Sequence, residues 1–206
     1  MTSDALQLKN STRWALGLVA ATLIYNSIEA AVSIAAGLDA GSIALIGFGF
    51  DSLIEVSAGA VVLLHLVRRS DDDSVAEQRT AQFVGLTFVL LAAYVGFEAV
   101  RDLTASQEPG VSYLGIAIAV ASLVLMPVTS IAKHRLAHRI NSRALEAESR
   151  ETLICSYLSV ALLLGLGANA LFGWWWADPV TALVIVAVLA REGWEAFTRR
   201  ELCCID

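Results

Sequence analysis

Long apolar runs alternate with short polar segments along almost the whole chain. Six of these runs reach about 20 residues, the length that an α-helix needs to cross a bilayer. They cover residues 14–37, 41–67, 81–100, 111–132, 152–172 and 179–197. None shows the period-two alternation of polar and apolar residues that is typical of membrane β-barrel strands. The pattern therefore predicts an all-α membrane protein, a bundle of six transmembrane helices.

Composition supports this class. Hydrophobic residues make up 57% of the chain and charged residues only 17%, whereas soluble domains contain about 45–50% and 25%. The first apolar run is too long for the hydrophobic segment of a signal peptide, so we expect it to remain as a helix. A formal net charge of −6 and the lack of a basic cluster argue against a nucleic-acid partner.

The positions of Lys and Arg predict the orientation. Of the 14 Lys and Arg residues, all but Arg101 fall on one side of the six runs. The positive-inside rule then places both termini in the cytoplasm of a multi-pass protein of the cell membrane. We expect a cytoplasmic tail at 1–12, a transmembrane domain at 13–198 and a second cytoplasmic tail at 199–206. The basic segment 133–143 is expected to be a cytoplasmic loop.

The start of the sixth helix has its own local signal. Trp174, Trp175 and Trp176 suit an aromatic belt at the outer interface, and Asp178 directly precedes Pro179. An acidic N-cap followed by proline at the first helical position is a common helix start. The sequence therefore predicts that Asp178 caps this helix.

Two pairs of polar residues interrupt the apolar runs with the same spacing. Asp51 and Glu55 lie in the second run, and Glu151 and Cys155 lie at the start of the fifth. Each acid inside a membrane helix costs roughly 2.5–3.5 kcal/mol, which favours a functional role. The i, i+4 spacing puts both members of a pair on one helix face. If the two faces meet, one sulfur and three carboxylates form a shell for a divalent metal, although a buried Cys155 could also serve only in packing.

Other polar residues are candidates of lower rank. Asn26 and Glu29 share a face of the first helix and are both candidates to line an ion path, with a hydrogen bond in helix packing as the alternative, above all for Asn26. His134 and His138 form an i, i+4 pair that is either a metal relay or part of a solvated turn. The vicinal pair Cys203 and Cys204 is a candidate for cytoplasmic metal capture.

These residues carry a resemblance to a known family. S-I-A-L-I-G-F-G-F-D-S-L-I-E in the second run, A-E-S-R-E-T-L-I-C at the start of the fifth and G-W-W-W-A-D-P at the start of the sixth are arranged in a way that resembles the cation diffusion facilitator family of divalent metal transporters. The resemblance spans about residues 13–197. It implies that Asp51 and Glu55 are the second-helix ligands, and that Glu151 and Cys155 replace the fifth-helix His and Asp. The chain is expected to be a short form, without the family's C-terminal cytoplasmic domain.

The resemblance and the ligand set together predict a divalent metal transporter and not an enzyme. The metal is substrate, not cofactor; zinc is the first choice, with cadmium, iron, cobalt or manganese as alternatives. Clustered carboxylates cannot all stay ionised in low dielectric without a cation, so we expect metal/proton antiport by alternating access. The expected partners are the metal ion, protons and the lipid bilayer, while a homodimer through transmembrane helices stays open. The alternative is a non-transporting membrane metal sensor or scaffold.

Overall fold

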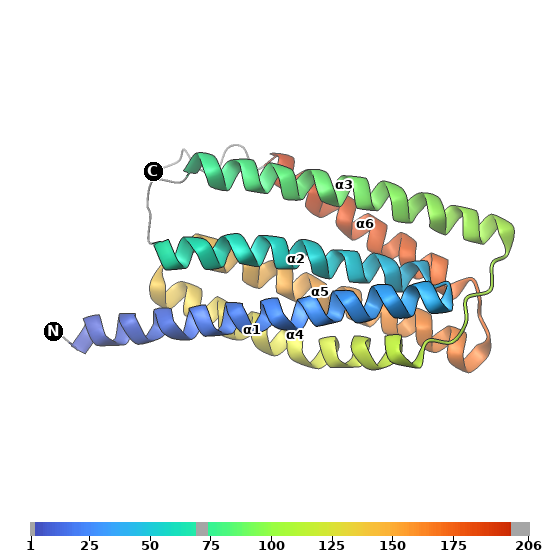
Figure 1. Ribbon diagram of the computed structural model, residues 1–206, viewed down its shortest axis with the longest axis horizontal. Helices are drawn as coiled ribbons and strands as arrows, with labels where there is room; N and C mark the ends of the chain where they lie inside the picture. Colours follow the sequence, from blue (N-terminus) through green and yellow to red (C-terminus); the bar gives the residue numbers. More distant parts are fainter. Residues whose placement is uncertain (1–2, 69–73, 199–206) are drawn as a thin grey trace.

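The computed structural model describes the backbone of residues 3–68 and 74–198, which forms six helices (Figure 1). The helices are α1 Ser3–Ala40, α2 Ile43–Arg68, α3 Ser74–Ala105, α4 Tyr113–Ile140, α5 Arg143–Phe172 and α6 Ala177–Thr198. Four stretches, Asn10–Ala40, Ile43–Leu64, Tyr113–Ile140 and Ala144–Phe172, are long and apolar enough to cross a membrane. The other two helices, α3 and α6, pack against each other and complete the bundle. The predicted all-α class and the six helices are confirmed.

Successive helices run in opposite directions, so the start of α1 and the end of α6 lie at the same end of the bundle (Figure 1). The end of α2, the start of α3 and the α4–α5 connection also lie at that end, which we call the basic end (Figure 1). The α1–α2, α3–α4 and α5–α6 connections lie at the opposite end. Helix α2 is central, because it packs against α1, α3, α5 and α6.

The helices extend well beyond the apolar runs. Helix α5 begins at Arg143, nine residues before the apolar run that starts at 152, and only Asn141 and Ser142 separate it from α4. Asn141 takes a left-handed conformation with φ of 51°, and the Ser142 hydroxyl accepts a hydrogen bond from the Leu145 N–H. These two residues end one helix and cap the next. The prediction of a loop at 133–143 is therefore wrong, because most of that segment is helical.

Many large apolar side chains lie on the outer surface of the bundle, while several charged side chains are buried beside the apolar core. Phe97, Leu164 and Leu171 are 68%, 69% and 79% exposed, whereas Glu29 and Lys133 are 0% and 1% exposed. Exposure of so many large apolar side chains to water would be unfavourable, whereas contact with lipid favours apolar side chains outside and paired polar side chains inside. The outer surface of the bundle is thus suited to hydrocarbon.

Asp178 does not cap its own helix. It lies inside the first turn of α6, which begins at Ala177, and its carboxylate accepts a hydrogen bond from the Ser42 hydroxyl. The Ala44 N–H at the start of α2 donates to the same carboxylate at 3.4 Å. The prediction of an N-cap is corrected, because the carboxylate instead satisfies donors at the N-terminus of α2. Asp178 thereby joins α6 to α2.

A close approach between α1 and α2 depends on Gly49. A Cβ atom at this position would lie 2.7 Å from Ile34 Cγ1, 3.0 Å from the Ile34 backbone N and 3.1 Å from the Ala30 carbonyl oxygen. Because two of these atoms belong to the backbone of α1, Gly49→Ala should lower the free energy of unfolding by about 1–3 kcal/mol. Thermal unfolding followed by circular dichroism in detergent measures this change.

Gly17→Ala is the matched control, because a Cβ at Gly17 meets nothing within 4 Å. Alanine should leave stability unchanged there or raise it by up to about 1 kcal/mol. Equal melting temperatures for the two variants would contradict the proposed close packing of α1 and α2.

Candidate metal site

A buried cluster of ligand atoms lies where α1, α2 and α5 meet. One carboxylate oxygen of Glu29, one of Glu55 and the Cys155 sulfur all lie within 4.8 Å of one another. The three residues are 0%, 8% and 0% exposed. We call these three residues the central cluster. Each comes from a different helix, so the packing of the bundle creates the cluster.

Hydroxyl groups from three helices surround Glu29. The Ser52 hydroxyl of α2 donates to Glu29 Oε2 at 3.0 Å, and the Ser122 hydroxyl of α4 donates to Glu29 Oε1. The Tyr25 hydroxyl lies 3.5 Å from Glu29 Oε1 and 2.7 Å from Ser122 Oγ. These contacts fix the rotamer of Glu29 and direct its carboxyl group toward the other two members of the cluster.

Asn26 positions Glu55. Its Nδ2 donates to Glu55 Oε2 at 3.0 Å. Asn26 and Glu29 of α1 therefore both form hydrogen bonds with side chains of α2, Asn26 with Glu55 and Glu29 with Ser52. Within the described part of the chain, the buried Asn26 Oδ1 has no hydrogen-bond partner. A buried amide oxygen without a donor is unusual and is well suited to a cation.

Asp51 and Glu151 lie outside the central cluster. Asp51 is 5% exposed and Glu151 is half-buried. Both are close enough to Glu55 for their charges to interact. The structure thus unites one member of each predicted pair, Glu55 and Cys155, with Glu29, and it leaves the first member of each pair outside.

The direction of the helices explains this arrangement. Helices α2 and α5 run in opposite directions (Figure 1). Asp51 precedes Glu55 by one turn, so its Cα lies about 6 Å toward the end opposite the basic end. Glu151 precedes Cys155 by one turn, and its Cα lies about 6 Å toward the basic end. The two acids therefore flank the central cluster along the bundle axis.

A buried ion pair lies close to the site, and the sequence did not indicate it. Lys133 Nζ of α4 is 2.8 Å from Glu148 Oε1 and 3.0 Å from Thr152 Oγ1 of α5. Lys133 is 1% exposed, so it is not a residue of a solvated loop. The available signal was the i, i+4 spacing of Glu148 and Thr152, which places both on the face of α5 toward α4. No ion pair with Lys or Arg is found for Glu29, Asp51 or Glu55 among the side chains that the structure describes.

The central cluster can bind a cation with two carboxylates and one thiolate. Zinc accepts both oxygen and sulfur ligands, and a three-ligand protein site leaves a position open for water or exchange. Carboxylates alone would favour harder ions such as manganese, while sulfur extends the range toward zinc and cadmium.

Two pairs of residues that were predicted as further metal ligands remain, the histidine pair and the cysteine pair. The predicted pair His134 and His138 lies at the basic end, and Glu146, which the sequence did not single out, brings its ligand atom within 4.8 Å of theirs. Cys203 and Cys204 lie outside the described residues.

Comparison with known proteins finds similarity to membrane proteins that export cations. The family described as the cation efflux transmembrane domain matches residues 19–199. The manganese efflux system protein MneS of Bacillus subtilis is 25% identical over 199 residues, which cover 93% of this chain and 67% of the relative. The cation-efflux pump FieF of Shewanella oneidensis is 28% identical over 128 residues, covering 62% and 41%.

A third relative, the uncharacterized transporter sll1263 of Synechocystis, is 27% identical over 151 residues, covering 69% of this chain and 49% of the relative. The matches therefore span between 41% and 67% of the length of these relatives.

Proposed function

Because the chain belongs to the cation efflux family of membrane transporters, we propose that it carries a divalent metal ion across the membrane through the central cluster. The observation that supports this most directly is the convergence of Glu29, Glu55 and Cys155 from three helices within 4.8 Å. Buried acids inside a membrane bundle are costly unless they have a function. A metal ion would neutralise them and occupy their free lone pairs.

Alternating access would use the two flanking acids. Glu151 lies toward the basic end and Asp51 toward the opposite end, so an ion could pass from one carboxylate to the central cluster and then to the other. Rocking of the helices would open each side in turn. The cluster without metal would hold protons, because adjacent carboxylates repel one another in low dielectric. Metal/proton antiport follows as the coupling that we propose.

The ligand set supports zinc as the first candidate, with cadmium, manganese, iron and cobalt as further substrates. Manganese receives support from the name of the Bacillus subtilis relative. Proteoliposomes with an imposed pH gradient test the function through metal uptake and proton release. Metal binding without flux would instead favour a membrane metal sensor.

Cys155 should influence the choice of metal. Cys155→Ser replaces a soft ligand by a hard one, so the preference for Cd²⁺ over Mn²⁺ in transport should fall on the order of tenfold. Competition between the two ions in proteoliposomes of the parent and the variant measures this ratio. An unchanged ratio would mean that the sulfur packs in the core without touching the metal.

A further inference from the structure

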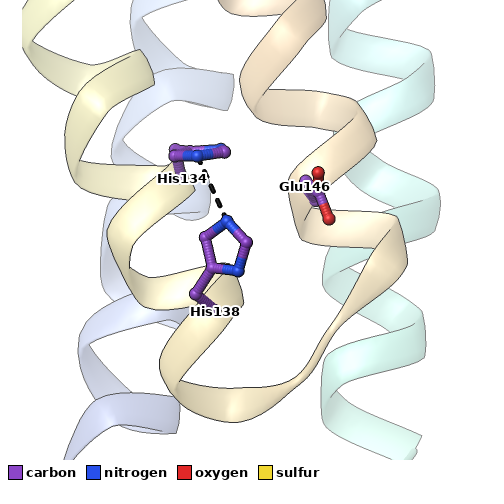
Figure 2. Close-up of side chains that lie close together, drawn as sticks. All are labelled: His134, His138 and Glu146. Carbon is purple, nitrogen blue, oxygen red and sulfur yellow. Dashed lines mark hydrogen bonds between the residues drawn. The ribbon is translucent and has the colours of Figure 1, made fainter.

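A second group of metal-ligand side chains lies at the surface of the basic end. His134 and His138 project from the last turns of α4, and Glu146 projects from the first turn of α5 (Figure 2). Both histidines are exposed and Glu146 is half-buried. All three ligand atoms lie within 4.8 Å of one another. This group is separate from the central cluster and contains none of its residues.

The local fold creates this arrangement. The i, i+4 spacing puts both imidazoles on one face of α4. The two-residue connection Asn141–Ser142 then turns the chain back at once, so the first turn of α5 lies against the last turns of α4. Glu146 follows the N-cap Ser142 by one turn and therefore faces the histidines across the turn.

The distance between the imidazoles fits a shared metal ion. His134 Nε2 and His138 Nε2 are 3.2 Å apart. Two nitrogens bound to one tetrahedral zinc at 2.0–2.1 Å are about 3.3 Å apart, so both rings could coordinate one ion with little movement. In the metal-free state one ring must donate the N–H and the other must accept it. Metal binding would replace that hydrogen bond by two coordinate bonds.

Arg150 competes for the third ligand. Its Nη2 lies 2.7 Å from Glu146 Oε1, and its side chain is 62% exposed. Exposed i, i+4 ion pairs contribute little to stability because solvent screens them, so a metal ion can displace the guanidinium. Arg135 and Arg139 add positive charge near the histidines, but solvent and salt screen exposed charges strongly.

We propose that His134, His138 and Glu146 form a second divalent-metal site at the surface, with two nitrogen ligands, one oxygen ligand and a position open to water. The imidazoles favour Zn²⁺, Co²⁺, Ni²⁺ and Cu²⁺ over Mn²⁺. The site differs in this respect from the central cluster, which contains no imidazole. The open position makes it an exchanging site and not a structural one. The proposal concerns binding alone and does not depend on transport through the central cluster.

Equilibrium dialysis of the purified chain, prepared without a polyhistidine tag, tests the proposal with Zn²⁺ and Mn²⁺. The double variant His134→Ala/His138→Ala should bind one Zn²⁺ fewer per chain than the parent, while its Mn²⁺ binding stays unchanged. Glu55→Ala should retain this surface Zn²⁺, which separates a failure of the central cluster from a failure of this site. Co²⁺ should give a visible tetrahedral absorption that the double variant lacks.

Arg150→Ala tests the proposal in the opposite direction, because it should strengthen Zn²⁺ binding. Removing the competitor should raise the Zn²⁺ affinity of the surface site by up to about fivefold. Arg191→Ala is the matched control, because Arg191 forms a similar exposed pair with Glu195, at 3.0 Å and four residues apart, in α6. Retention of the full Zn²⁺ stoichiometry and affinity by the histidine double variant would overturn the proposal.

Discussion

Glu55→Ala should abolish metal uptake into proteoliposomes. Glu55 belongs to the central cluster and is 8% exposed, so its loss removes one of the three side chains that we propose as metal ligands. Changes in residues that hold the ligands in place typically lower metal affinity by 10–100-fold. Loss of a ligand itself should lower metal affinity by at least about 100-fold. Flux of Zn²⁺ and Mn²⁺ under an imposed pH gradient measures the effect.

Graded variants sharpen this test. Glu55→Gln should be nearly as damaging, because the amide keeps the shape of the side chain and loses its charge. Asn26→Ala should have an intermediate effect, since Asn26 only donates a hydrogen bond to Glu55 at 3.0 Å. Glu108→Gln, an exposed acid in the α3–α4 connection, should transport at the parent rate. Parent-like flux in Glu55→Ala would place the transport site elsewhere.

Lys133→Met should be the most destabilising change outside the central cluster. It would leave Glu148 buried without its cation, and loss of one partner of a buried ion pair costs about 3–5 kcal/mol. Lys133 also donates to Thr152 Oγ1 at 3.0 Å, so this buried hydroxyl loses a donor and keeps its own hydrogen bond to the Glu148 carbonyl. Thermal unfolding in detergent, followed by circular dichroism, should show a large fall in the melting temperature.

The double variant Lys133→Met/Glu148→Met supplies the matched control. Replacement of a whole buried ion pair by apolar residues is often neutral or stabilising, so the double variant should regain much of the stability that the single variant loses. If Lys133→Met alone unfolded at the parent temperature, the pair would not be buried in the folded protein.

The helical class was accessible from sequence because it depends on local properties. Apolar runs of about 20 residues and the absence of period-two alternation require no knowledge of contacts. The residues at which the helices begin and end were harder to predict from the sequence. Helix α5 begins at Arg143 within a charged segment, where the Asn141–Ser142 turn and the pairing of Lys133 with Glu148 sustain helix beyond the apolar run.

The sequence by itself determined that Glu55 and Cys155 carry polar ligand atoms on defined helix faces, because the i, i+4 spacing is a property of one helix. Only the tertiary structure decided which residues meet. Helices α2 and α5 are antiparallel, which separates Asp51 from Glu151 along the bundle axis, and α1 packs beside α2 so that Glu29 joins Glu55 and Cys155 in the central cluster. Contacts between helices depend on direction and packing, and local spacing contains neither.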